Sequence, residues 1–247
     1  MTDTRTFTQK VGQTKPTRDF HEHFYISLKH RYGFHTVGKA ANSTVKHILY
    51  EQELRGTRFP MPSVHDRMAA PLLSPYQFSD SQLTDILFAG DTFLFTFVRN
   101  PFSRTLSCYL DRIQDHKSRP YRELMNFIGQ KPGYSPSFEE FIDAICAQTQ
   151  FQQNNHWRSQ YSDTLAEHIP YDFIGKQESF DEDIRYVHRR IFGTPLAQGA
   201  AATNASPRET SATERMAGYW STDIRDRFVE KFERDFWFFG YDMGTLG

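Results

Sequence analysis

Residues 33–46, GFHTVGKAANSTVK, come close to the loop that binds the phosphates of nucleoside triphosphates. The pattern of that loop is G-x-x-x-x-G-K-[ST], and Gly33, Gly38 and Lys39 match it. Position 40 is Ala, where a triphosphate-binding loop carries the hydroxyl that holds Mg²⁺. The sequence therefore predicts a loop for a phosphate-like group that is not a magnesium nucleotide.

The chemistry of this loop comes from its backbone and from a few polar side chains. Backbone N–H groups at a turn that leads into a helix bind anions. Lys39 adds a positive charge, and the alternative is a strand-ending turn with a solvated Lys39. The candidate anion-binding residues are Gly38, Lys39, Ala40, Asn42, Ser43 and Thr44.

A second candidate anion site lies in residues 97–108, FVRNPFSRTLSC. Arg99 follows a predicted strand, and ligands of open α/β sheets bind at the carboxyl ends of strands. Ser107 comes eight residues later, on the helix that Asn100 and Pro101 are expected to begin. Arg can grip a phosphate with two parallel hydrogen bonds, and the alternative is an Arg99 that pairs with a surface carboxylate. We expect Arg104 to be a solvated helix residue.

Apolar runs and amphipathic segments alternate along the chain. This order predicts an α/β fold, P-loop-like and three-layered, with a central parallel sheet flanked by helices. We expect residues 1–18 to be a flexible N-terminal arm and residues 19–247 to be a single domain. The predicted strands are 32–37, 92–98 and 171–175, the predicted helices are 42–55, 81–88, 102–113, 137–146, 179–192 and 221–236, and the predicted loops are 56–80, 116–136 and 194–212.

The composition excludes several classes of protein. A net charge of −1 over 247 residues gives no reason to expect a nucleic acid partner. No apolar run approaches the ~20 residues of a membrane span, and residues 1–20 lack the apolar core of a secretion signal. We therefore expect a soluble, cytoplasmic chain without a transmembrane segment. Cys108 and Cys146 have no metal-ligand spacing, so we expect two reduced thiols and no metal site.

Two anion sites at the ends of two strands resemble the sulfotransferase superfamily. There the first loop holds the 5′-phosphosulfate of 3′-phosphoadenosine 5′-phosphosulfate (PAPS), and an Arg/Ser pair holds its 3′-phosphate. The resemblance implies these roles for the Lys39 loop and for Arg99 with Ser107. It also explains Ala40, because sulfuryl transfer from PAPS needs no metal.

Three further stretches resemble the membrane-type carbohydrate sulfotransferases of the chondroitin, dermatan and HNK-1 group, sulfotransferase family 2. They are HWRSQ at 156–160, YDFIGKQE at 171–178 and DFWFFGY at 235–241. The chain lacks the membrane anchor, stem and lumenal cysteines of that group. We therefore expect a soluble relative of bacterial type, with the identity of the acceptor left open.

The resemblance implies that an acceptor hydroxyl attacks the sulfur of PAPS in line and that 3′,5′-ADP leaves. Lys39 would stabilise the charge that grows on the bridging oxygen. The hydroxyl needs a general base, and His65 is the first candidate because related uronyl sulfotransferases place a catalytic His between the two PAPS motifs. His156 is the second. The alternatives are a surface loop for His65 and a structural turn packed by Trp157 for His156, and we expect His35 in the core.

The acceptor is expected to be a hydroxyl-bearing glycan or glycoconjugate, with Glu178 near it or orienting Lys176. Ala40 and the lack of an apolar strand ending in Asp argue against the rival, a P-loop kinase or other ATP-dependent phosphotransferase. A non-catalytic nucleotide-binding protein and a sulfotransferase for protein tyrosine or lipid stay open. Residues 56–75 and 116–136 are expected to border the acceptor. Basic residues crowd in and beside these segments and would suit an acidic sugar, the alternative being ordinary solvated charge; they are Arg55, Arg58, Arg67, Arg112, Lys117, Arg119 and Arg122.

Overall fold

The computed structural model describes residues 5–197, 199–200 and 211–246. The chain divides into two compact units, residues 1–98 with 164–207 and residues 99–163 with 208–247. Each unit has hydrophobic clusters of its own.

The first unit contains a four-stranded sheet in the order β1 (Phe24–Ser27), β2 (Tyr32–His35), β3 (Phe93–Val98) and β4 (Phe173–Lys176). The pairs β2–β3 and β3–β4 are parallel, and β1 is antiparallel to β2. This confirms the predicted α/β fold with a central sheet flanked by helices, although the sheet is mostly and not wholly parallel because of β1. The sequence analysis missed β1, a short edge strand that forms a hairpin with β2 through a turn in which Arg31 has a φ of 53°.

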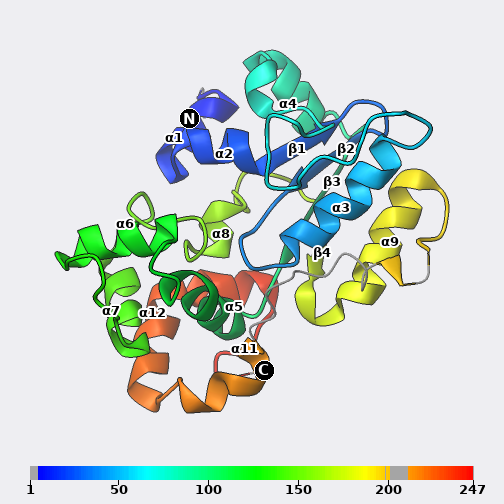
Figure 1. Cartoon of the computed structure of the whole chain (residues 1–247). Coiled ribbons are helices and arrows are strands. Elements are labelled where there is room, and N and C mark those ends of the chain that lie inside the picture. The colour runs from blue at the N-terminus through cyan, green and yellow to red at the C-terminus, as the bar shows by residue number, and fades with distance from the viewer. Residues whose placement is uncertain (1–4, 198, 201–210, 247) are drawn as a thin grey trace. The chain divides into compact units, whose positions relative to one another are not determined.

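Helices cover both faces of this sheet (Figure 1). On one face, α3 (Asn42–Glu53) and α9 (Phe180–Phe192) share a hydrophobic cluster with alternate residues of β2 and β3. On the other, α1 (Phe7–Thr14), α2 (Thr17–His23) and α4 (Asp80–Phe88) pack against residues of β1 and β3. β3 is therefore buried along its whole length, as expected for a continuous apolar run in a sheet that is covered on both faces.

The N-terminal region differs from the flexible arm expected over residues 1–18. From Phe7 onwards it forms α1 and α2, and Phe7, Val11 and Phe20 are buried. A capping box begins α1: Gln9 N donates to Thr6 Oγ1 at 3.3 Å, and Thr6 N donates to Gln9 Oε1 at 2.9 Å. The polar composition concealed two apolar residues, four positions apart, that lie on one face of a helix.

The second unit consists of helices around an aromatic core that includes Phe102, Trp220 and Phe236. The predicted helices at 102–113, 137–146 and 221–236 are confirmed, whereas α6 occupies a segment predicted to be a loop. Most of the predicted loop 194–212 lies outside the described residues. The helices are α5 (Pro101–Cys108), which continues as a π-helical turn (Tyr109–Ile113), α6 (Arg119–Ile128), α7 (Phe138–Ala147), α8 (Gln160–Asp163), α11 (Ala212–Arg215) and α12 (Thr222–Phe239).

A buried carboxylate joins α12 to the start of α8. Asp235 is 1% exposed, and its Oδ1 accepts hydrogen bonds from Ser159 Oγ at 2.5 Å and from Tyr161 N at 2.9 Å. Its Oδ2 accepts one from Gln160 N at 2.7 Å. Burial raises the pKa of Asp235, and these donors together with the positive charge of Arg104 act against that rise. The carboxylate therefore fixes the hydroxyl of Ser159 and the backbone N–H groups of the next two residues.

Gly175 in β4 leaves no room for a side chain. A Cβ at this position would lie 2.5 Å from Phe97 Cε1, and Phe97 is buried in the sheet. We expect Gly175→Ala to lower the free energy of unfolding, measured in urea, by about 1–3 kcal/mol through overpacking. Gly218→Ala is the control, because a Cβ there meets nothing within 4 Å. Equal losses in the two variants would contradict the steric explanation.

Asp235→Ala removes the acceptor of three buried hydrogen bonds. We expect a loss of about 3–5 kcal/mol in the free energy of unfolding, because the donors stay buried without partners. Asp226→Ala on the exposed side of α12 should change it by less than about 0.5 kcal/mol. A small effect at Asp235 would show that the network does not hold α8 to α12.

Candidate functional site

The loop between β2 and α3 has an unusual backbone. Lys39 and Ala41 have φ values of 68° and 53°, in the left-handed region. That conformation costs a residue with a Cβ roughly 1–2 kcal/mol, and such residues are concentrated at ligand sites. Ala40 N donates to Val37 O at 3.3 Å, and Ala40 is buried while Lys39 is half-buried. The loop is thus a tight turn that keeps its Lys at the surface.

The first turn of α3 lacks a side-chain cap. Asn42 and Ser43 are residue types that often cap helices, but Ala41 stands at the cap position and Asn42 begins the helix. Uncapped N–H groups at a helix start are a binding site for anions. Asn42 Oδ1 is buried and has no hydrogen-bond partner within the described part of the chain. Asn42 and Ser43 are half-buried, and Thr44 is buried.

In the second unit, Arg99 is fixed through its own backbone. Arg99 N donates to Gln160 Oε1 at 2.9 Å, and Gln160 Nε2 donates to Arg99 O at 2.8 Å. Both residues are buried. Gln160 is in turn held by Asp235 through its backbone N–H. The Gln of the HWRSQ stretch and the Asp of the DFWFFGY stretch therefore act together to position Arg99.

The Arg99 side chain is oriented by a serine that the sequence analysis did not name. Arg99 Nε donates to Ser103 Oγ at 2.9 Å. Ser103 and Ser107 are one helical turn apart on α5, so their hydroxyls lie on one face, and both are buried. Ser103 could have been predicted from the sequence, because it lies four residues before Ser107 and therefore on the same face of the helix.

The prediction that Arg104 is solvated was wrong. Arg104 is 1% exposed and donates to Arg158 O at 2.9 Å and to Asn155 O at 3.1 Å. Arg158 pairs with Asp163, with 3.1 Å between Nη1 and Oδ1, and both are buried. These bonds bind α5 to the HWRSQ stretch, a long-range contact that local sequence does not encode.

The candidate histidines differ in their surroundings. His65 is exposed, and its backbone N–H donates to Ser63 Oγ at 3.3 Å. His156 is half-buried; Asn154 Oδ1 lies 2.7 Å from its Nδ1 and accepts a bond from its backbone N–H at 2.9 Å. His35 is fully buried, as expected, with its Nε2 3.0 Å from Lys15 Nζ.

The predicted site residues divide between the two units. Gly38, Lys39, Ala40, Asn42, Ser43, Thr44 and His65 belong to the first unit, and Arg99, Ser107 and His156 belong to the second.

Most of the YDFIGKQE stretch serves the sheet. Asp172 exchanges two bonds with the Leu94 backbone: its Oδ2 accepts from Leu94 N at 2.7 Å, and its N donates to Leu94 O at 2.8 Å. Lys176 N donates to Asp183 Oδ2 at 2.7 Å at the start of α9. Only Glu178 at the end of the stretch is exposed beyond the strand.

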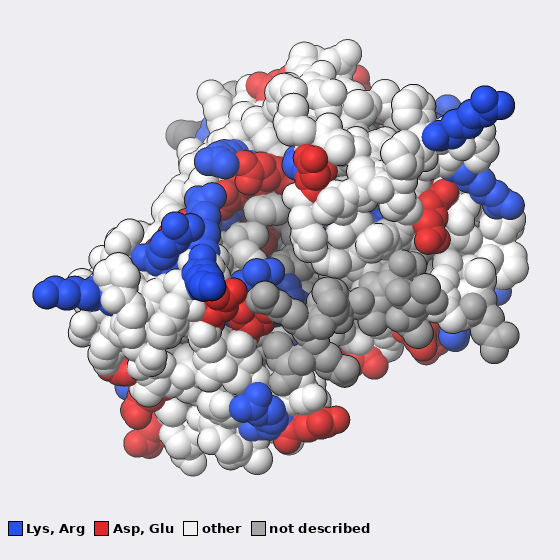
Figure 2. Space-filling model, viewed as in Figure 1, with Lys and Arg blue, Asp and Glu red and all other residues white. Residues whose placement is uncertain are grey.

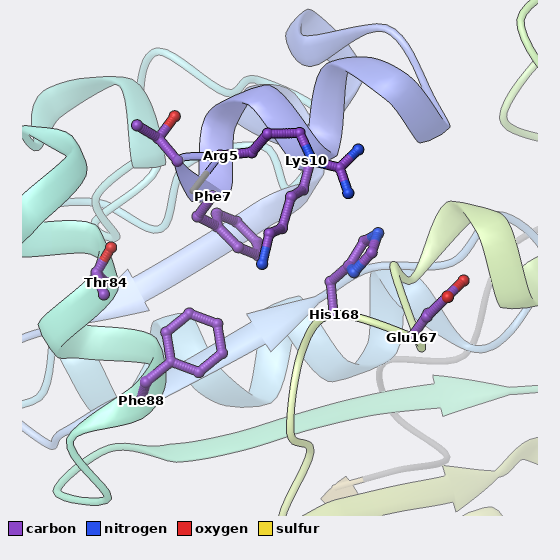
Figure 3. Close-up of a pocket in the computed structure, with 8 residues that line it drawn as sticks. Arg5, Phe7, Lys10, Thr84, Phe88, Glu167 and His168 are labelled. Carbon is purple, nitrogen blue, oxygen red and sulfur yellow. The ribbon is translucent and has the colours of Figure 1, made fainter. Parts of the chain in front are cut away.

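A surface pocket of about 410 Å³ lies elsewhere in the first unit (Figure 3). It contains none of the predicted site residues. Two of its aromatic rings, Phe7 and Phe88, make an edge contact with 5.8 Å between centroids. The lining residues are Arg5, Thr6, Phe7, Lys10, Thr84, Phe88, Glu167 and His168.

The surface charge is mixed. Lys and Arg side chains lie beside Asp and Glu side chains over the face shown in Figure 2. Within the ranges that the structure covers, no helix is long and apolar enough to cross a membrane. In the same ranges, no three His, Cys, Asp or Glu side chains are grouped to hold a metal ion.

Comparisons with known proteins agree with this geometry. The model of the sulfotransferase family, Sulfotransfer_2, matches residues 22–242. Carbohydrate sulfotransferase 11 of Rattus norvegicus is 26% identical over 90% of this chain and 68% of its own length. Carbohydrate sulfotransferase 12 of Xenopus laevis is 31% identical over 60% of this chain and 39% of its own length, and carbohydrate sulfotransferase 14 of Homo sapiens is 27% identical over 75% and 50%. No solved structure matches the chain significantly. Because the family model covers almost all of the sequence, the chain belongs to the sulfotransferase family and is a sulfotransferase.

Proposed function

We propose that this sulfotransferase moves the sulfuryl group of PAPS to a hydroxyl of a carbohydrate or glycoconjugate, without a metal ion. The observation that carries the proposal is the strained loop before α3, which leads into a helix start without a side-chain cap. Similarity to proteins named carbohydrate sulfotransferases supports the glycan acceptor.

The loop is suited to the 5′-phosphosulfate. Backbone N–H groups at the start of α3 and the hydroxyls of Ser43 and Thr44 would bind the phosphate oxygens. Lys39 would contribute the charge that stabilises the leaving oxygen as it becomes negative. Ala40 supplies no Mg²⁺ ligand, and a sulfuryl transfer of this kind does not need one.

Arg99 and the serines of α5 are suited to the 3′-phosphate. Guanidinium groups form bidentate, charge-assisted hydrogen bonds with phosphates. Ser103 orients the Arg99 side chain through its Nε, and the guanidinium and the Ser107 hydroxyl would donate hydrogen bonds to the phosphate oxygens. The fixed Arg99 backbone lowers the entropic cost of binding.

The chemical step would be an in-line displacement at sulfur. The acceptor oxygen forms the new O–S bond while the bond from sulfur to the bridging oxygen of the 5′-phosphate breaks. The acceptor proton passes to the base, for which His65 is the first candidate and His156 the second, and 3′,5′-ADP leaves. Exposed basic residues such as Arg58 and Arg119 would favour an acidic glycan.

Binding of 3′,5′-ADP in EDTA tests the donor site, with calorimetry and thermal stability as readouts. We expect wild-type protein to bind and to gain stability. Arg99→Lys keeps the charge but cannot form two parallel hydrogen bonds with a phosphate, so the Kd for 3′,5′-ADP should rise about 10- to 100-fold. Ser103→Ala should raise it by about fivefold, because it removes one orienting hydrogen bond.

Arg185→Ala is the control for this experiment, since Arg185 is an exposed residue of α9 whose partner is the surface residue Asp181. Its Kd should equal that of the wild type. Stabilisation by ATP with Mg²⁺ alone would reject the PAPS site and favour a phosphotransferase.

The two candidate bases are separated by turnover of PAPS with desulfated chondroitin as the probe acceptor. We expect His65→Ala to lower kcat by about 10²- to 10⁴-fold, the usual contribution of a general base, with an unchanged Kd for 3′,5′-ADP. His156→Ala should lower kcat by less than about tenfold, since the Asn154 contacts indicate a role in the turn. The reverse ranking would assign the base to His156.

A further inference from the structure

The segment that carries His65 runs between α3 and α4 and is attached to the edge of the sheet. At its far end, Ile26 N donates to Leu73 O at 3.0 Å and Leu73 N donates to Ile26 O at 2.9 Å. Figure 1 shows this segment in cyan near β1, β2 and α3. Asp66 N donates to Ser63 O at 3.0 Å, which closes a turn around His65.

Lys46 attaches the segment to α3. It is a residue of the helix that begins at the anion-binding loop, and it is 5% exposed. Its Nζ donates to the carbonyl oxygen of Val64, the residue before His65. The ammonium also lies 5.6 Å from the centroid of the Tyr25 ring. One bond thus joins the backbone next to His65 to the helix of Ser43 and Thr44.

Arg67 holds the other side of His65. Its guanidinium donates to Leu72 O at 3.0 Å, to Leu73 O at 2.9 Å and to Phe24 O at 3.3 Å. It stacks on Tyr25, with 4.2 Å between Cζ and the ring centroid. Arg67 was expected among the basic residues near the acceptor, whereas its guanidinium donates to backbone carbonyls of its own segment and of β1.

Burial makes the charges of Lys46 and Arg67 costly, because both are partly removed from water. Burial, followed by the nearby positive charge of Arg67, lowers the pKa of Lys46 to about 8. Three tyrosines lie close enough to act on the charge of Arg67: Tyr25 on β1, Tyr50 on α3 and Tyr76. An apolar side chain of similar length would avoid the desolvation of Lys46. Stability alone therefore does not explain an ammonium at this position.

We infer that Lys46 and Arg67 are positioning residues that fix the backbone on both sides of His65 relative to the start of α3. The inference rests on the proposed function, in which a base must lie at a set distance from the sulfur of PAPS. Fixing the backbone around His65 would hold the base at that distance. Both cations donate to backbone carbonyls, so they constrain the path of the chain and leave the exposed imidazole accessible to an acceptor.

The test compares Lys46→Met with wild type in two measurements. In turnover of PAPS with desulfated chondroitin, we expect kcat to fall about 10- to 100-fold, since small displacements of a catalytic group have effects of this size. The Kd for 3′,5′-ADP should stay within about threefold. In hydrogen exchange, the amides of residues 63–67 should exchange at least about tenfold faster, while those of 93–98 stay unchanged.

Three further variants complete the test. Lys46→Arg keeps a donor for Val64 O and should recover most of kcat. Arg67→Lys keeps the charge but cannot donate to three carbonyls at once. If Lys46→Met does not fold, Arg67→Lys should show the same loss of kcat and the same faster exchange. Ile184→Val removes a methyl group from the hydrophobic cluster that also contains Val64. It should lower Tm without affecting kcat or the hydrogen exchange of the amides of residues 63–67.

Hydrogen exchange separates the two proposals. If the wild type does not transfer sulfate, the proposed function fails, and faster exchange in Lys46→Met still supports the attachment of the His65 segment. If the wild type is active, unchanged kcat and unchanged exchange in Lys46→Met and Arg67→Lys would overturn the inference.

Discussion

Two hydrogen bonds between the Gln160 side chain and the backbone of Arg99 determine where the Arg99 side chain starts in the second unit. They have this effect because Gln160 is itself fixed by Asp235 and because Ser103 holds the Arg99 Nε. Residues near positions 99, 160 and 235 thus form one buried polar network in which each hydrogen bond orients the next group. Arg99 is the member suited to a phosphate, and the others maintain its orientation.

The loop before α3 depends on a different constraint, backbone strain. Glycine at position 39 or 41 would adopt the left-handed conformation without penalty, yet the chain has Lys39 and Ala41 there. Packing of the buried Ala40 and Val37 offsets the strain. A lysine that is retained at a position favouring glycine is best explained by its charge, which supports the role proposed for Lys39 at the leaving oxygen.

The sequence predicted what local chemistry determines and missed what tertiary contacts determine. The apolar run of β3 and the Asn100–Pro101 start of α5 were predicted correctly, and Asn100 Oδ1 caps the helix by accepting from Phe102 N at 2.9 Å. The edge strand β1 was missed because its four residues show no alternation of their own. Arg104 was misassigned because its acceptors are carbonyls more than 50 positions away. The positions of the site residues followed from motifs, whereas the groups that support them, Asp235 and Gln160 above all, had no visible role before the fold was known.

Binding and proton transfer place opposite demands on a site, and the chain meets them in different ways. A residue with the phosphate-binding role that we propose for Arg99 gains from burial, since hydrogen bonds to charge are stronger away from water. A base for an external hydroxyl must stay accessible, so its side chain cannot be fixed by burial and its backbone must be fixed instead. His65 meets this condition, because it is exposed while Lys46 binds the carbonyl of the preceding residue and Arg67, two residues later, is bound to the carbonyls of Leu73 and β1. His156 does not, because Asn154 binds both its ring and its backbone. A buried and a half-buried cation whose hydrogen bonds go only to backbone carbonyls are therefore the feature to expect beside an exposed base. The cost of desolvating them is the consequence of holding that base without covering it.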